Sequence, residues 1–137
     1  KELLANDFAV FRAFCDAEIA MSAHVLFEAI DPYSAASTSK KLIDIIRSDI
    51  KFSGLLISDD ISMAALSGDI KKRTTNLIEA GNDVILHCNA KLFEMKEIIE
   101  SGVAPNTLTL SRMTSVIEER KKIEHTKIEN LESSQSS

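Results

Sequence analysis

The chain has 137 residues, 45% of them hydrophobic and 27% charged, and a formal net charge of −5 at pH 7. This length and composition fit one domain, or part of one, that can bury a hydrophobic core. The acidic balance, without a basic stripe or interleaved aromatic and basic residues, argues against nucleic-acid binding. No apolar run approaches the roughly 20 residues that a membrane helix needs, so no membrane span is expected.

The N-terminal half is predicted to alternate helices with buried strands. A short helix is predicted over 7–14, and the first strand over Glu18–Val25. Hydroxyl residues that can cap a helix then begin the segment 37–50, whose apolar residues fall on one face. The apolar run Gly54–Ser58 is predicted as the second strand.

The same alternation continues in the second half. A helix is predicted over 68–81, where Gly81 is a natural C-cap, and the third strand over Asp83–Cys88. Helices over 91–102 and 110–123 follow.

This order of elements implies right-handed crossovers between parallel strands. The second and third strands are continuous apolar runs, which is typical of a parallel sheet covered on both faces. The sheet is therefore either small and doubly wound or a piece of a larger barrel. Residues 125–137 are polar and rich in serine, and we interpret them as a disordered tail after a domain over 1–124.

Cys15 and Cys88 lie far apart in the chain and form no spacing typical of a metal site. They are interpreted as reduced thiols, which favours a cytoplasmic location. No metal or cofactor is predicted.

Polar residues follow all three predicted strands. Asp59 and Asp60 follow the second, His24 the first, and His87, Cys88 and Asn89 the third. The carboxyl ends of parallel strands meet at one edge, where α/β proteins carry their chemistry, so these residues are expected to converge.

Each of these residues also has a structural interpretation. Asp59 or Asp60 can cap a helix beginning at "ISMAAL". His24 can be a hydrogen-bonded structural histidine, and His87, inside an apolar run, can be packed in the core. Met63 can be core filling. The residues alone leave these alternatives open.

Four motifs occur in order: "MSAH" (Met21–His24), "DP" (Asp31–Pro32), "IIRSDIKFSGLLISDDISM" (Ile45–Met63) and "EAGNDVILHCN" (Glu79–Asn89). Together they resemble glycoside hydrolase family 3, and most closely its bacterial β-N-acetylhexosaminidases of peptidoglycan recycling. That branch typically reads M-T-A-H, L-R-x-x-L-G-F-D-G, S-D-D-L-S-M and A-G-C-D. This chain departs from it at "KFSG" (Lys51–Gly54), at Asn82 and at Ala35.

The resemblance implies a (β/α)₈ catalytic barrel, of which these three strands would be the C-terminal portion, and a retaining mechanism. By motif position, Asp59 would be the nucleophile and Asp60 a supporting residue that orients the loop or caps a helix. His24 would lie near the nucleophile or the sugar, and Met63 would pack beside the sugar. The substrate would be a muropeptide with a terminal β-linked N-acetylglucosamine, and no metal or cofactor is implied.

The family's acid/base histidine follows a K-H-F-P-G-H-G-like motif that this chain lacks, so no acid/base residue is assigned. We therefore expect little or no hydrolysis from the isolated chain. An alternative is a non-catalytic remnant, or a half-barrel that assembles with a separate N-terminal half, since the sheet edges would be unpaired.

A third hypothesis is a receiver-like signalling module, because "LLISDD" is similar to the metal-binding acids of such domains. Those domains also need a phosphoacceptor aspartate at the end of a later strand, where this chain has His87-Cys88-Asn89.

Overall fold

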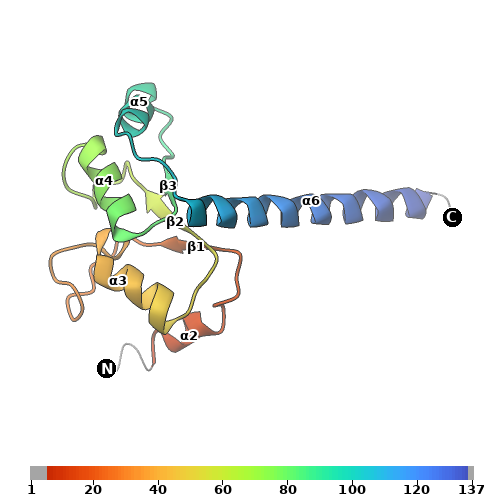
Figure 1. Ribbon diagram of the computed structural model, residues 1–137, viewed down its shortest axis with the longest axis horizontal. Coiled ribbons are helices and arrows are strands. Elements are labelled where there is room, and N and C mark those ends of the chain that lie inside the picture. The colour runs from red at the N-terminus through yellow and green to blue at the C-terminus, as the bar shows by residue number, and fades with distance from the viewer. Residues whose placement is uncertain (1–5, 136–137) are drawn as a thin grey trace.

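A computed structural model describes the backbone of residues 6–135 and the side chains of residues 6–123 (Figure 1). The elements follow in the order α2 (Ala9–Arg12), β1 (Ile19–Ser22), η1 (Ala36–Thr38), α3 (Lys40–Asp44), η2 (Ile45–Asp49), β2 (Leu55–Asp60), α4 (Ile70–Ala80), β3 (Val84–Leu86), α5 (Leu92–Glu100) and α6 (Thr107–Gln135). No helix of the described residues has both the length and the apolar character to cross a membrane.

The described sheet has three parallel strands in the order β1-β2-β3. Strand β1 pairs with β2 in continuous register from Ile19 opposite Leu55 to Ser22 opposite Ser58. The pairing of β2 with β3 is irregular where β2 ends. The predicted parallel α/β arrangement is confirmed, although β1 and β3 are shorter than predicted and β2 extends two residues further, to Asp60.

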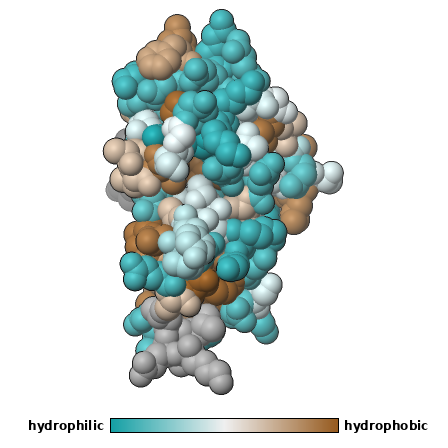
Figure 2. Space-filling model, turned by 90° about the vertical axis from the view of Figure 1, so that its left-hand side faces the viewer, coloured by the Kyte–Doolittle hydropathy of each residue, from teal (hydrophilic) through white to brown (hydrophobic). Residues whose placement is uncertain are grey.

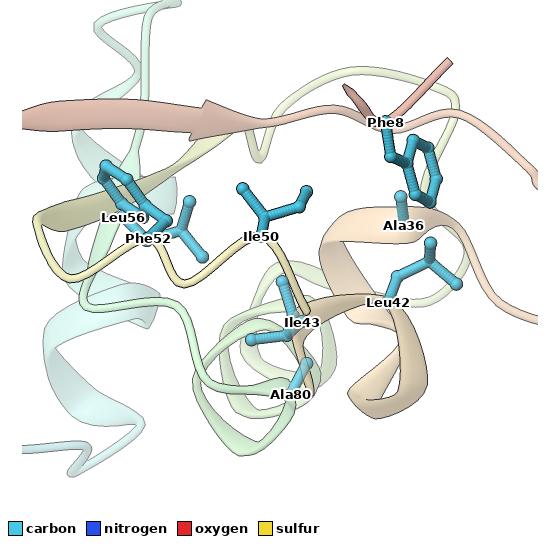
Figure 3. Close-up of a cluster of buried hydrophobic side chains, with 8 residues drawn as sticks. All are labelled: Phe8, Ala36, Leu42, Ile43, Ile50, Phe52, Leu56 and Ala80. Carbon is cyan, nitrogen blue, oxygen red and sulfur yellow. The ribbon is translucent and has the colours of Figure 1, made fainter. Parts of the chain in front are cut away.

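One face of the sheet is covered by helices. Leu56 of β2 is 1% exposed and lies in the main hydrophobic cluster with residues of α3 and the segments around it (Figure 3). The alternate residues of β1, Ile19 and Met21, are 38% and 57% exposed. The expectation of a sheet covered on both faces came from the second and third strands, and on β2 the adjacent Leu55 and Leu56 are both buried, whereas β1 keeps one face exposed in the described chain. An apolar run indicates that a strand can be buried, but it does not indicate which neighbouring element covers the strand.

Helix α4 begins at Ile70, later than predicted, and ends at Ala80, just before Gly81, the predicted C-cap. The Asp69 carboxylate accepts a hydrogen bond from the Lys72 N–H at 2.8 Å, and Gly81 adopts φ +113° after the last turn. Its buried face meets Ile61 and Leu66 through Leu77, which is fully buried. The predicted helix over 37–50 is instead a short 3₁₀ turn, then α3 with Ser39 as N-cap, then a π-helical turn.

Helix α6 continues to Gln135 and projects away from the sheet (Figure 1). Most of the segment predicted as a disordered tail is thus helical in its backbone, and residues 136–137 lie outside the described residues. No glycine or proline interrupts α6, and its many Glu, Lys and Leu residues favour helix.

A buried carboxylate joins the amino ends of β2 and β3 to α6. Asp83 accepts hydrogen bonds from Arg47 Nη2 at 2.6 Å, Arg112 Nη1 at 2.8 Å, the Leu56 N–H at 2.9 Å and Thr109 Oγ1 at 3.0 Å. Burial raises the pKa of Asp83, but these donors and charges outweigh it and leave the pKa below its usual value. This cluster lies at the edge of the sheet opposite Asp59 and stabilises the fold.

The outer surface carries scattered hydrophobic patches on a mostly hydrophilic face (Figure 2). Helix α5 contributes to them, because Leu92 and Phe93 are 80% and 62% exposed.

Candidate active site

Strand β2 ends in the two carboxylates that the sequence singles out. They lie where the register between β2 and β3 shifts, between Ile57 and Asp60. The two acids are adjacent in the chain but have different hydrogen-bond partners.

Asp59 is half-buried and only partly engaged. Its Oδ1 accepts a hydrogen bond from the Asp60 N–H at 2.8 Å. No described side chain donates to its other oxygen, Oδ2. The carboxylate is thus oriented by one bond and keeps one oxygen available.

Asp60, by contrast, accepts three hydrogen bonds through both of its carboxylate oxygens. Its Oδ1 accepts from the Ser62 N–H at 3.0 Å and the Cys88 N–H at 3.1 Å, and its Oδ2 accepts from Ser62 Oγ at 2.6 Å. Burial raises the pKa of Asp60, but these hydrogen bonds outweigh it and hold the pKa below its usual value. Asp60 therefore ties the end of β2 to the loop after β3.

The capping interpretation of the acidic pair is wrong, because no helix begins at Ile61. The chain makes a turn there and the next helix starts at Ile70, capped by Asp69. Asp60 instead stabilises this turn, because its carboxylate accepts a hydrogen bond from the Ser62 N–H.

His24 lies beside the end of β2, in the loop after β1. Its Nε2 is 3.0 Å from the carbonyl oxygen of Asp60, and its Nδ1 is 2.6 Å from Ser37 Oγ. Both ring nitrogens are engaged within the protein.

Met63 follows in the turn after Asp60 and is 42% exposed, so it is not core filling. Arg73, from α4, donates through Nη1 to the carbonyl oxygens of Ile61 at 2.9 Å and Met63 at 3.0 Å and so fixes this turn. The sequence analysis missed Arg73, because its position on the exposed stripe of a predicted helix carries no signal of this contact.

A second polar cluster lies at the end of β3. Glu94, buried in the first turn of α5, accepts hydrogen bonds from His87 Nε2 at 2.9 Å, Asn89 Nδ2 at 2.7 Å and Lys91 Nζ at 3.2 Å. The bond from His87 is the main cause that lowers the pKa of Glu94, followed by that from Asn89. His87 is packed, as one interpretation predicted, and Glu94 was not foreseen.

The rim is open rather than enclosed. Cavities of about 800, 500 and 460 Å³ lie elsewhere on the chain, and none of them is lined by His24, Asp59 or Met63. Among the described residues no group of three His, Cys, Asp or Glu side chains could hold a metal ion.

Polar side chains at the carboxyl edge of parallel strands that alternate with helices are the arrangement of a TIM-barrel-type domain. Residues 1–118 match the family described as "Glycosyl hydrolase family 3 N terminal domain", so the chain belongs to this family. The family resemblance of the motifs and the barrel-type α/β class are confirmed.

Individual relatives agree with this assignment. A β-hexosaminidase of Stenotrophomonas maltophilia (strain K279a) is 34% identical over 113 residues, which are 80% of this chain and 34% of the relative. A β-hexosaminidase of Vibrio cholerae is 36% identical over 96 residues, 66% of this chain and 29% of the relative.

Among solved structures, NagZ from Neisseria gonorrhoeae in complex with N-trifluoroacetyl-D-glucosamine superposes with a TM-score of 0.69 and 32% identity. The match covers 82% of this chain and 33% of that one. The chain therefore spans about a third of the length of the relatives that it matches.

Proposed function

We propose that this chain supplies the nucleophile of a retaining glycoside hydrolase that acts on terminal β-linked N-acetylglucosamine, with Asp59 as the nucleophile. The observation that carries the proposal is the state of Asp59 at the carboxyl edge of β2: one oxygen accepts from the Asp60 N–H, and no donor among the described residues reaches the other. The names of the relatives support the substrate class. Muropeptide recycling in the cytoplasm is the physiological role that we propose with it.

In a retaining mechanism the free oxygen of Asp59 attacks the anomeric carbon and forms a covalent glycosyl-enzyme, which water then cleaves. The bond that Oδ1 accepts from the Asp60 N–H orients the carboxylate for this attack. Asp60 is less suited to this role, because both of its carboxylate oxygens already accept hydrogen bonds.

Departure of the leaving group needs a proton donor in natural substrates. His24 has both nitrogens bonded within the protein, and His87 is paired with Glu94. We therefore assign no acid/base residue among the side chains that the structure describes. Substrates whose leaving group needs no protonation should react best.

The test uses a fluoride leaving group, which departs without acid assistance. The chain is incubated with 2-acetamido-2-deoxy-5-fluoro-β-glucosyl fluoride, and the adduct is located by intact and peptide mass spectrometry. We expect one sugar on Asp59, lost in Asp59→Asn and retained in Asp69→Asn, a matched change of an exposed helix cap. A label on another residue, or one that persists in Asp59→Asn, contradicts the assignment.

An N-acetylglucosaminide with an alkyl aglycone, whose alkoxide leaving group needs protonation, serves as the second substrate. We expect little or no turnover from the isolated chain. Hydrolysis that disappears in Asp59→Ala would show that an acid/base residue is present after all.

The alternative is a half-barrel that functions only after assembly with another chain. The observation that favours it is β1, whose outer edge has no partner strand among the described residues, while its Ile19 and Met21 are exposed. An apolar cavity of about 460 Å³ adjoins this edge. Sedimentation velocity of the unchanged chain and of Met21→Lys tests it: association that the charge abolishes favours assembly through this edge, and a monomer in both cases argues against it.

A further inference from the structure

His24 occupies a position from which it reaches backbone rather than ligand. Its Nε2 is 3.0 Å from the Asp60 carbonyl oxygen, which has no proton to give, so Nε2 must carry the proton of this hydrogen bond. Its Nδ1 is 2.6 Å from Ser37 Oγ. The two contacts together determine the state of the ring.

The hydroxyl of Ser37 selects that state. Ser37 is fully buried, and the contact of its hydroxyl with His24 Nδ1 is the one hydrogen bond found for it among the described residues. Buried hydroxyl protons need an acceptor, and Nδ1 can accept only in the neutral ring. His24 is therefore the neutral Nε2–H tautomer.

Ser37 is itself held by a buried amide. Asn82 Nδ2 donates to the Ser37 carbonyl oxygen at 2.7 Å and to the Leu77 carbonyl oxygen at 2.6 Å, and Asn82 Oδ1 accepts from Ser22 Oγ at 2.6 Å. These bonds join the end of β1, the η1 turn and the end of α4. The hydroxyl that orients His24 thus belongs to a rigid part of the fold.

Asp60 is then held from both neighbouring strands. From the side of β1, His24 binds its carbonyl oxygen; from the side of β3, the Cys88 N–H binds its carboxylate. The backbone N–H of Asp60 in turn donates a hydrogen bond to the Asp59 carboxylate.

We propose that His24 is a positioning residue for the Asp59 carboxylate: oriented by Ser37, it fixes the backbone of Asp60, whose N–H orients the nucleophile. This proposal rests on the proposed function of Asp59. It replaces a direct contact of His24 with the sugar, because the ring has no free nitrogen with which to bind a hydroxyl group.

The test compares His24→Leu, which loses the donor, with His24→Gln, whose amide N–H can still reach the Asp60 carbonyl oxygen. Labelling of Asp59 by the 5-fluoro glycosyl fluoride is measured against probe concentration. We expect His24→Leu to lower the maximal labelling rate about 10- to 100-fold with an unchanged half-saturating concentration, and His24→Gln to recover most of it. Asp44→Asn, an exposed change on α3, controls for general effects.

A role in sugar binding would instead raise the half-saturating concentration, and that result overturns the proposal. So does an unchanged maximal rate in His24→Leu.

Nuclear magnetic resonance keeps this test separate from the proposed function. Imidazole nitrogen shifts should show His24 protonated on Nε2 alone, and a tautomer mixture in Ser37→Ala. Hydrogen exchange of the Asp60 amide should accelerate in His24→Leu and stay slow in His24→Gln.

If the unchanged chain never labels Asp59, the proposed function fails, and these spectra still decide whether His24 orients the pair. A proton on Nδ1, or Asp60 exchange that is the same in all variants, refutes the positioning role.

Discussion

The substitution Asp83→Asn tests the buried ionic cluster at the amino edge of the sheet. Asp83, with a side chain 4% exposed, accepts from two guanidinium groups whose side chains are 18% exposed. An asparagine keeps the shape but removes the charge, and its NH₂ group would face two donors on whichever side it lies. Arg47 and Arg112 would then be left without their counter-charge.

Breaking a buried pair by removing one partner typically costs about 3–5 kcal/mol, because the remaining charge is uncompensated. We expect Asp83→Asn to lower the free energy of unfolding by about this amount. The matched control is Asp44→Asn, whose exposed pair with Lys40 should be worth less than about 0.5 kcal/mol.

The measurement is urea unfolding followed by far-ultraviolet circular dichroism, with the slope checked for two-state behaviour. Losses in the two variants that agree within about 0.5 kcal/mol, the size expected for a surface change, would refute the reasoning. They would mean that the cluster gains no more from its burial than a surface pair does.

Three further predictions concern packing, backbone and pH. Leu77→Ala removes a fully buried side chain and should cost about 2–5 kcal/mol in urea unfolding, whereas Leu92→Ala, 80% exposed, should change little; equal effects would contradict the described core. A Cβ on Gly54 would lie 2.4 Å from the Ala17 carbonyl oxygen, so Gly54→Ala should lower the thermal midpoint markedly, and an unchanged midpoint would show that the backbones separate there. Folding lowers the pKa of Asp83 from 3.8, so the stabilisation that its charge gives the folded state is complete well above pH 3.8 and is lost as the pH falls below that value. The urea midpoint should therefore fall less steeply between pH 7 and 3 in Asp83→Asn than in the unchanged chain. Parallel curves for the two proteins would contradict this.

The strands and the location of the site were predictable because their signals are local. Apolar runs that stop at polar residues predicted β2 and β3, and the right-handed crossover rule placed their carboxyl ends on one edge. The motif residues Asp59, Asp60 and His24 do lie together at that edge.

The contacts of these residues were not predictable, because they depend on partners far away in the chain. His24 meets Ser37 and the Asp60 backbone, and Asp60 meets the Cys88 N–H, 28 residues further on. Nothing in the local pattern distinguishes an aspartate that caps a helix at "ISMAAL" from one that caps a turn, and helix was the wrong choice there.

The sequence by itself determined the α/β class, the family and the identity of the acidic pair, since periodicity and motif spacing are properties of neighbouring residues. Motif position already separated the two acids, and tertiary structure decided which hydrogen-bond donors each of them meets. Asp60 accepts from Ser62, two residues further on in the turn, and from the Cys88 N–H in the loop after β3. Asp59 keeps a free oxygen because no described side chain reaches it. A carboxylate's availability depends on the donors that folding brings to it, and for Asp60 one of these lies 28 residues further along the chain.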